Sequence, residues 1–554
     1  MSRLKNSSSG VMGRRIYILF IVLVVVFGIL IYRIVDIQVL KSEKYSKNAE
    51  NQSVEKVELN SGRGIIYDRN GKKLTDTVKK TVLVVEKEKL NNNYKLIDLI
   101  KKATGNTELD IYKAIQQQMD KTLVELEVKK IDSKYTAQLI KNGILIEEKT
   151  SRYSKDNLLS HTIGYINKVD NVGKMGIEKS LDKVLKDSNE KYVSVFKAGR
   201  IGNKDDLNIL KGGIKKVVEN ANDKHVKLTI DSDIQKKVEK IADKEEHPTA
   251  IIVSDVNTGE ILAMSSRPNF DPNNLTKSLQ GKDREFENRV IKSTYAPGSV
   301  FKMVVLFSAL ENGIVDDNYT YTCTGQTKVG NTNEILKCHK HNGHGFQNLK
   351  DVFSNSCNPA FLDIGTKLGS EKILKTAEKL HLFEKVDIGL DEENMRKKPE
   401  KIFLRNLSIG QENMEFTPIQ INQMTQIIAN NGTYKPLKLF DSIVDNEGKS
   451  IKTFKSNKTE EIISPYVSTR VKDMMKFVST VGTAKVLEDL EGGSGVKTGT
   501  AQSNINKIPI EHGWTTGYYP ADRPKYVITA IVEGNKNGNK SAVPIFKEIC
   551  QSLN

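Results

Sequence analysis

The sequence contains a serine and a lysine whose spacing suits a nucleophile and its base. Ser299 and Lys302 follow a Pro-Gly pair at 297–298 and open an apolar run at 300–310. Because proline and glycine often punctuate the chain before a helix, we expect Ser299 at a helix N-terminus, with Lys302 on the same face. A neutral lysine there can take the proton of an attacking hydroxyl. The pattern alone is not specific, because residues 180–183 repeat it.

Two later segments carry the other groups that acyl transfer needs. Ser356 and Asn358 place a hydroxyl and an amide two residues apart. Residues 495–501 form a strand-like run in which a glycine allows another backbone to approach closely. The functional members of this run are Lys497, Thr498, Gly499 and Thr500. Because long stretches of chain separate the three segments, only a folded domain can bring them together. Their ordered occurrence predicts one active site.

The ordered set Ser-x-x-Lys, Ser-x-Asn and Lys-Thr-Gly is the signature of penicillin-binding proteins and serine β-lactamases. Nearly the whole chain resembles the class B penicillin-binding proteins, which are monofunctional D,D-transpeptidases of peptidoglycan synthesis. The resemblance also covers residues 63–71, 152–153, 161–165, 173–178 and 512–520. Ser154 and Thr515 stand where proline and an aromatic residue are commoner. The resemblance implies an α/β transpeptidase domain, with an antiparallel sheet between helices, on an α+β pedestal.

The chemistry of acyl transfer suggests a role for each member of the trio. We expect Ser299 to attack the carbonyl of a D-Ala-D-Ala stem peptide, or a β-lactam, and to hold the acyl group until an amine takes it. Lys302 must then be neutral, so burial and the charge of Lys497 must lower its pKa from about 10.4. Asn358 can hold Lys302 and the substrate amide, while Ser356 passes a proton to the leaving nitrogen.

The Lys-Thr-Gly segment is expected to bind the terminal carboxylate of the substrate. Lys497 supplies the charge, and Thr498 and Thr500 supply hydroxyl groups beside Gly499. We expect the backbone N–H groups of Ser299 and Thr500 to form an oxyanion hole, which contributes about 3–4 kcal/mol per donor in other acyl-transfer enzymes. This chemistry requires no cofactor.

The four cysteines leave three interpretations open. In an exported chain they can form disulfides, such as a Cys323–Cys338 bridge, or they can remain free thiols. The third interpretation is a structural zinc site, because three cysteines and three histidines lie within residues 323–357. Its expected ligands are Cys323, Cys338, Cys357 and His344, with His341 or His339 as alternatives to His344. Residues 343–345 and 356–358 also resemble the sporulation-associated branch of the family.

An uncharged apolar run occupies residues 16–32. As a helix it would be about 25 Å long, which is the short end of a bilayer span. A cleaved signal peptide is the alternative, but the run is longer than a usual signal-peptide core and no cleavage site follows. We therefore expect an uncleaved single-pass anchor. The basic residues in front of it predict a cytoplasmic N-terminus and a catalytic domain on the outer side of the cell membrane: Arg3, Lys5, Arg14 and Arg15.

The length of 554 residues exceeds the usual size of one domain. We expect a cytoplasmic stub at 1–15, a transmembrane helix at 16–32, a pedestal at 33–222 and a transpeptidase domain at 223–554. The net charge of +16 suits anionic lipid headgroups or wall polymers. A location outside the cytoplasm excludes nucleic acid as the partner, and a cell-wall glycosyltransferase is the expected protein partner.

Two other functions fit parts of the pattern. A D,D-carboxypeptidase or a β-lactamase shares the trio, but such enzymes tend to lack the segment at 63–69, and no residue here identifies an activated water. A non-catalytic scaffold for a glycosyltransferase would not need the intact catalytic set. The sequence therefore favours a transpeptidase, and it leaves open whether the work is elongation, division or sporulation.

Overall fold

The computed structural model of the chain describes residues 8–36, 54–168, 170–186, 190–198, 208–219, 223–281, 283–454, 459–505, 508–534 and 538–554. Contacts divide the chain into two compact units made of interleaved segments. Unit 1 contains residues 1–59, 80–149 and 191–219. Unit 2 contains residues 60–79, 150–190 and 220–554.

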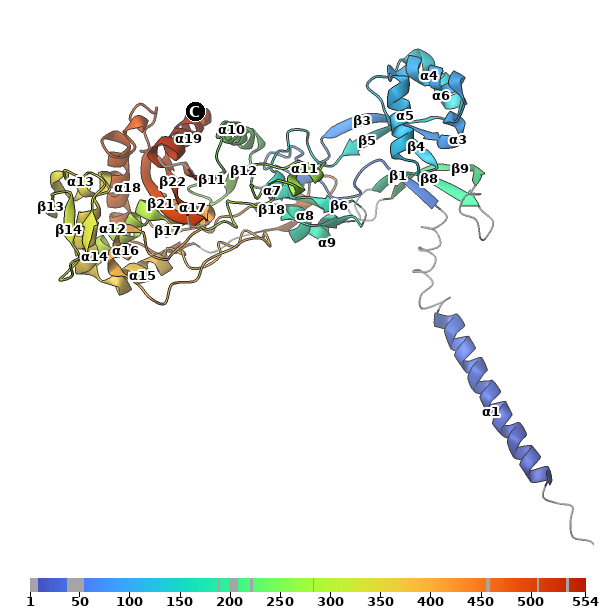
Figure 1. The fold of residues 1–554 in the computed structure, drawn as a ribbon, viewed down its shortest axis with the longest axis horizontal. Helices are drawn as coiled ribbons and strands as arrows, with labels where there is room; N and C mark the ends of the chain where they lie inside the picture. The colour runs from blue at the N-terminus through green and yellow to red at the C-terminus, as the bar shows by residue number, and fades with distance from the viewer. Residues whose placement is uncertain are drawn as a thin grey trace, which may run out of the picture. The chain divides into compact units, whose positions relative to one another are not determined.

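The N-terminal helix α1, Ser8–Val35, contains the apolar run at residues 16–32 (Figure 1). Within it, Tyr17–Val35 has a mean hydropathy of 3.0, and none of this stretch is buried inside the protein. A helix of 19 residues with this surface is long and apolar enough for one membrane span. It is the one such helix in the part of the chain that the structure describes.

The rest of unit 1 is an α+β fold with two three-stranded sheets. One sheet has the order β4-β3-β5, with strands Leu123–Glu127, Val78–Glu86 and Leu145–Ser151. Helices α3, α4, α5 and α6 span Lys87–Leu90, Tyr94–Thr104, Glu108–Gln117 and Ser133–Lys141. Leu83 of β3 and Ile97 of α4 belong to one buried core. The other sheet has the order β1-β8-β9, with strands Val54–Glu58, Glu190–Ala198 and Asn208–Glu219.

The N-terminal segments of unit 2 are joined by buried ion pairs. Arg63 Nε donates to Glu178 at 2.7 Å, and Arg152 Nε donates to the other oxygen of the same carboxylate at 2.7 Å. All three side chains are almost fully buried. Removing one partner would leave an uncompensated buried charge, so this network holds three distant segments together. The three residues come from the segments that resemble the family's pedestal.

A four-stranded sheet connects these segments to the rest of unit 2. Its order is β19-β18-β10-β2, with strands Ser450–Thr453, Phe440–Val444, His225–Leu228 and Ile66–Tyr67. The short elements around it are α7 Ser160–Ile163, β6 Ile166–Asn167, β7 Val172–Gly173, α8 Gly176–Ser180 and α9 Asp182–Leu185. Ile66 and Ile177 also belong to the large core of unit 2. Contacts therefore cross the boundary expected at residue 222, because residues 60–79 and 150–190 pack with unit 2.

The centre of unit 2 is a five-stranded antiparallel sheet in the order β12-β11-β23-β22-β21. Its strands, in that order, are Ile261–Arg267, Thr249–Asp255, Tyr526–Val532, Ile508–Tyr519 and Gly495–Ile505. The first two strands form a hairpin, whose turn needs Gly259 at a φ of 73°. The Lys-Thr-Gly segment lies on β21, which is an edge strand of the sheet.

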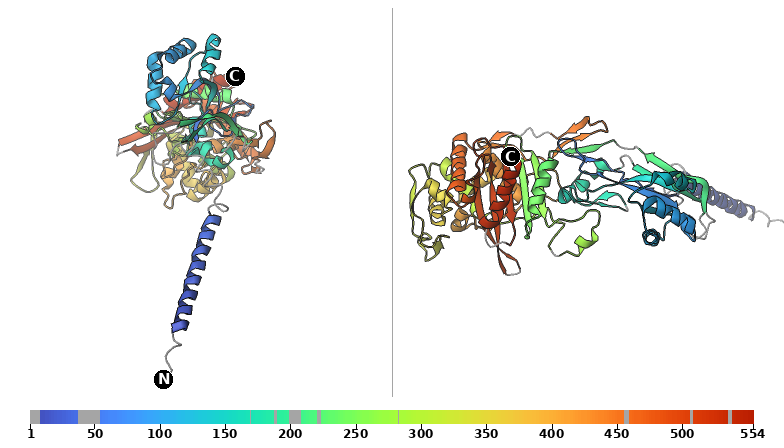
Figure 2. Two further views of the ribbon diagram at one scale, coloured as in Figure 1. Left: turned by 90° about the vertical axis from the view of Figure 1, so that its right-hand side faces the viewer. Right: turned by 90° about the horizontal axis from the view of Figure 1, so that it is seen from above.

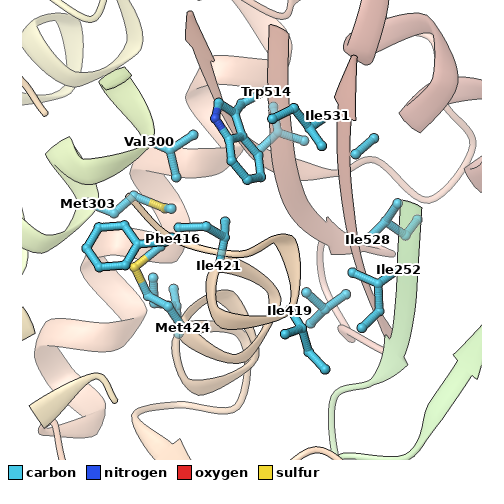
Figure 3. Close-up of a cluster of buried hydrophobic side chains, with 14 of the residues drawn as sticks. Ile252, Val300, Met303, Phe416, Ile419, Ile421, Met424, Trp514, Ile528 and Ile531 are labelled. Atoms are coloured by element: carbon cyan, nitrogen blue, oxygen red, sulfur yellow. The ribbon is translucent and has the colours of Figure 1, made fainter. Parts of the chain in front are cut away.

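Helices cover both faces of this sheet, as the resemblance implies (Figures 1 and 2). Helices α10, Ser232–Ala242, and α19, Gly538–Leu553, contact each other and the sheet, while α17, Pro418–Ala429, contacts β11, β22 and β23. Asp231 caps α10 by accepting from the backbone N–H groups of Asp233 and Ile234, which is a usual role of aspartate at a helix N-terminus. Figure 3 shows side chains from α17 and from β22 and β23 of the sheet gathered in a buried cluster with Val300.

A helical lobe packs beside the edge strand β21. It contains η2 Gly298–Phe301, α12 Lys302–Glu311, α13 Leu349–Ser354, α14 Asn358–Leu368, α15 Ser370–Lys379, α16 Leu404–Ile409, α18 Pro465–Thr480 and η3 Lys485–Leu487. Helix α12 contacts α14, α15 and α18, and both η2 and α18 contact β21. The remaining elements are α11 Thr276–Leu279, β13 Thr320–Cys323, β14 Gln326–Lys328, β15 Ile335–Lys337, β16 Gly345–Asn348, β17 Thr433–Tyr434 and β20 Glu460–Glu461.

Candidate active site

Ser299 lies in the 3-10 turn η2, which ends at Phe301, directly before α12 begins at Lys302. The predicted helix N-terminus is therefore present. Gly298 has a φ of 51°, and a Cβ atom on it would lie 2.3 Å from the carbonyl oxygen of Thr500. The indole Nε1 of Trp514 donates to the Ala296 carbonyl at 2.9 Å. Glycine and tryptophan thus fix the serine turn against the sheet edge.

Lys302 joins the Ser-x-x-Lys and Ser-x-Asn segments. Its side chain is fully buried. The Nζ atom donates to Asn358 Oδ1 at 2.6 Å, to the Ser356 carbonyl at 2.7 Å and to Ser356 Oγ at 3.1 Å. Ser356 adopts a φ of 52°, a left-handed conformation that a non-glycine residue keeps where the surrounding contacts hold it. This conformation allows its hydroxyl and its carbonyl to meet the same lysine.

Lys497 brings the third segment to the same hydroxyl. Its Nζ atom donates to Ser356 Oγ at 3.2 Å and to the Thr498 carbonyl at 3.0 Å, and the residue is fully buried. The Thr498 hydroxyl is 2.7 Å from that of Thr483. One hydroxyl group therefore lies between two buried amines from different segments of the chain.

Burial sets the electrostatics of these amines. It lowers the pKa of Lys302 to about 7, and thiol groups of the nearby cysteine cluster oppose the shift. Burial first, and the charge of Lys302 second, lower the pKa of Lys497 well below its ordinary value. Desolvation disfavours the ammonium form, and two amines around one hydroxyl disfavour double protonation. Lys302 is thus able to accept a proton near neutral pH.

A cleft of about 360 Å³ lies in front of these groups. The predicted residues that line it are Ser299, Ser356, Asn358, Thr498, Gly499 and Thr500. Lys302 and Lys497 lie behind this wall, since both are fully buried. The structure thus brings every predicted residue of the trio to one site.

Several cleft residues lie outside the predicted set. They are His339, Ile409, Gln411, Thr483, Gln502 and Glu511. Gln411 Nε2 donates to the Thr500 carbonyl at 3.2 Å, so it contacts the edge of β21 directly. Gln502 could have been found from strand alternation beyond Lys-Thr-Gly, and Glu511 is its register partner on β22. No local pattern marks Gln411 or Thr483.

The cysteine-rich segment forms a compact cluster beside the trio. One ligand atom from each of four residues lies within 4.8 Å of all the others: Cys323, Cys338, His344 and Cys357. All four cysteines of the chain are free thiols, so the expected alternative of a Cys323–Cys338 disulfide is not what the structure shows. Gly343 permits this packing, because a Cβ atom on it would lie 2.1 Å from the Cys323 carbonyl.

The three candidate histidines occupy different places. His344 belongs to the cluster, and its Nδ1 lies 3.5 Å from Cys338 Sγ. His339 stacks edge-on against His344 but lines the active-site cleft, and His341 is exposed. Three thiols and an imidazole match a closed tetrahedral zinc site both in the kind of donor atoms and in the number of ligands. Cys357 lies between Ser356 and Asn358 in sequence, so the cluster is next to the catalytic loop.

Comparison with known families identifies the class of protein. Residues 249–551 match the penicillin-binding protein transpeptidase domain, and residues 58–213 match the penicillin-binding protein dimerisation domain. The first match covers more than half of the chain, which therefore belongs to the penicillin-binding protein transpeptidase family. The two domains together make it a class B penicillin-binding protein.

Individual relatives agree with this assignment. The chain is 29% identical to stage V sporulation protein D of Bacillus subtilis, over 95% of this chain and 84% of the relative. It is 24% identical to the peptidoglycan D,D-transpeptidase MrdA of Escherichia coli K12, over 96% of this chain and 93% of the relative.

Solved structures share the fold. A chain of a peptidoglycan synthase complex that coordinates polymerization and crosslinking has a TM-score of 0.67 at 23% identity, covering 97% of this chain and 98% of its own. The penicillin-binding protein PBP2 of Helicobacter pylori has a TM-score of 0.64 at 24% identity, and the match covers 90% of this chain and 99% of the PBP2 chain.

Proposed function

We propose that the chain is a membrane-anchored peptidoglycan D,D-transpeptidase that acts through an acyl-enzyme on Ser299. The observation that carries the proposal is the hydrogen-bond network of Lys302, Ser356, Asn358 and Lys497 behind the cleft that Ser299 lines. A nucleophile, a neutral amine and a hydroxyl between two amines are the parts that acyl transfer requires. The serine-type acyltransferase function agrees with the family.

Acylation begins when Lys302 accepts the proton of Ser299 as its oxygen attacks the carbonyl of the penultimate D-Ala. The carbonyl oxygen becomes negative and is stabilised by the backbone N–H groups of Ser299 and Thr500. Ser356 gives a proton to the leaving nitrogen and regains one from the lysines that it contacts. The terminal D-Ala leaves, and the acyl group stays on Ser299 as an ester. β-Lactams form the corresponding ester by opening of their ring.

Deacylation completes the cross-link when an amine of a neighbouring stem peptide attacks the ester. The amine loses a proton, Ser299 regains one, and the new amide joins the two strands. Before the terminal D-Ala leaves, Lys497 and the Thr498 hydroxyl bind its carboxylate, while Asn358 holds Lys302 and the substrate amide. These roles assign the same five catalytic residues that the sequence predicts.

The anchor and the partners complete the proposal. The basic residues in front of the apolar run support an N-terminus in the cytoplasm and unit 2 on the outer side of the membrane. A cell-wall glycosyltransferase is the proposed partner, since a structural neighbour comes from a complex that coordinates polymerization and crosslinking. The catalytic chemistry itself involves no cofactor.

The cysteine cluster is proposed as a structural zinc site. Cys323, Cys338, Cys357 and His344 would supply all four ligands, so no position would remain for a catalytic water. The metal would brace the loop that carries Ser356 and Asn358 from behind. It would take no part in proton transfer.

Covalent labelling with a fluorescent penicillin tests the proposed nucleophile. Ser299→Ala should abolish the adduct, because it removes the attacking oxygen. Ser180→Ala, which changes the other Ser-x-x-Lys serine, should keep the adduct, and mass mapping should place it on the peptide that contains Ser299. An adduct of full mass on the Ser299→Ala protein would refute the assignment.

A further inference from the structure

A second cleft of about 520 Å³ lies next to the active-site cleft. Gln502 lines both clefts. Glu511 lines the first cleft and His512, the next residue of β22, lines the second. Ala296, three residues before the nucleophile, also lines the second cleft. The larger cleft is therefore adjacent to the catalytic groups and adjoins β21 beyond the Lys-Thr-Gly segment.

The direction of the substrate leads into this cleft. In the proposed function the terminal carboxylate lies at Lys497 and Thr498, and the attacked carbonyl lies between Ser299 and the N–H of Thr500. The donor peptide, followed towards its N-terminus, thus advances along β21 from Thr498 to Gln502. An extended peptide advances about 3.3 Å per residue, so the residue before the D-Ala-D-Ala end lies beside Gln502. Its side chain can enter the second cleft.

The carboxylates of this cleft are held in fixed positions. Glu533 is nearly buried and accepts from Arg289 Nε at 2.9 Å and from the Tyr295 hydroxyl at 2.6 Å. Glu415 accepts from Thr294 Oγ1 at 2.7 Å and is half-exposed. A carboxylate that is already oriented by neighbouring donors can bind an ammonium group with little further ordering.

Cations lie in the same wall and remain accessible. Lys292 is exposed, and no carboxylate among the described residues forms an ion pair with its ammonium group. Arg396 contacts Glu415 at 3.2 Å through Nε, while its side chain is 62% exposed. The wall thus places accessible cations beside an oriented carboxylate. This wall suits a side chain that carries both an ammonium and a carboxylate better than a side chain with only one of these charges.

We propose that this cleft binds the side chain of the donor residue that precedes D-Ala-D-Ala and selects one that ends in both an ammonium and a carboxylate, as diaminopimelate does. The proposal rests on the proposed transpeptidase function. That residue carries an amine, because stem-peptide amines form the cross-links. Its carboxylate pairs with Lys292 and Arg396, and its ammonium group pairs with Glu415. The cleft is thereby the determinant of donor specificity.

Two synthetic pentapeptides test this inference with the full-length chain in detergent. They end in D-Ala-D-Ala and differ only at the third residue, which is diaminopimelate or lysine. Release of D-Ala with glycine as acceptor amine gives a specificity constant for each. We expect diaminopimelate to be favoured about fivefold, which corresponds to one partly exposed ion pair. A third peptide, in which the side-chain carboxylate is amidated, should behave like the lysine peptide.

Variants separate the cleft from other causes of preference. Lys292→Ala and Arg396→Ala should each bring the ratio of the two specificity constants towards one, while the neighbouring surface change Lys397→Ala should keep it. Penicillin has no group that corresponds to the third residue. The rate at which it acylates Ser299 therefore shows whether each variant is folded and serves to normalise its specificity constants. A ratio of one in the unaltered protein, or an unchanged ratio in both cleft variants, would overturn the inference. A protein without any penicillin adduct would instead refute the proposed function.

Discussion

At the scale of single residues, the site depends on one hydroxyl that two buried amines share. Ser356 accepts from Lys302 and from Lys497, and each lysine comes from a different segment of the chain. Burial of both amines favours their neutral forms, which are the forms that move protons. The contacts with the two amines hold Ser356 in its strained backbone conformation, with a φ of 52°.

The pKa of Lys302 predicts how acylation depends on pH. Burial lowers it to about 7, so the amine is neutral above that pH and protonated below it. Only the neutral amine accepts the proton of Ser299. The rate constant of penicillin acylation should therefore fall about tenfold for each pH unit below about 7 and level off above it. Stopped-flow labelling between pH 5.5 and 8.5 measures this, and a flat profile in a protein that stays folded would contradict it.

Local motifs made the catalytic residues predictable. Spacing and neighbouring proline and glycine residues identify Ser299, Lys302 and the Lys-Thr-Gly segment in the sequence. Gln411 and Thr483 were not predictable, because only the packing of α16 against η2 and of α18 against β21 brings them to the cleft. The choice of His344 over its two neighbours likewise depends on the fold around Gly343 and not on spacing.

At the scale of elements, the serine turn and the sheet edge must approach without a side chain between them. Gly298→Ala should slow acylation about a hundredfold, because the new Cβ atom would meet the Thr500 carbonyl at 2.3 Å and displace the nucleophile. Gly313→Ala is the matched control. Its φ of 64° imposes the same strain of about 1 kcal/mol, but no atom lies within 4 Å.

The comparison of the two glycine variants isolates the close approach. Both should lower the melting temperature, and only Gly298→Ala should slow penicillin acylation strongly. Equal acylation rates in the two variants would show that the contact between η2 and β21 does not position Ser299.

The loop behind Ser356 provides a second prediction at this scale. Protein purified without added metal should contain about one equivalent of zinc, and a chelator should lower its melting temperature by several degrees. His344→Ala should lose the metal, whereas His341→Ala should keep it, because His341 is exposed and outside the cluster. Elemental analysis with less than about a tenth of an equivalent would refute the site. A mass that shows a Cys323–Cys338 disulfide would do the same.

At the scale of the whole molecule, the chain combines one apolar helix with two interleaved units. The anchor was predictable because hydropathy is a local signal, and the central sheet was expected from the family resemblance. The interleaving was not, because the ion pairs of Arg63 and Arg152 with Glu178 join segments far apart in the sequence. Such pairings leave no periodic pattern.

The anchor predicts the topology of the molecule. Protease added outside spheroplasts should digest the C-terminal bulk of the chain, because the basic residues in front of the apolar run predict a cytoplasmic N-terminus. Membranes should retain the apolar helix. Release into the medium of a protein that begins after residue 33 would show that the run is a cleaved signal peptide.

Cross-linking is the activity that tests the account most directly. Glycan strands with D-Ala-D-Ala stem peptides would be incubated with the membrane-extracted chain, digested to muropeptides and weighed by mass spectrometry. The account predicts dimers that have lost one D-Ala per cross-link, and none with Ser299→Ala or after penicillin treatment. Monomers that have lost D-Ala without any dimers would identify a carboxypeptidase, and unchanged monomers would indicate a scaffold; either result would contradict the account.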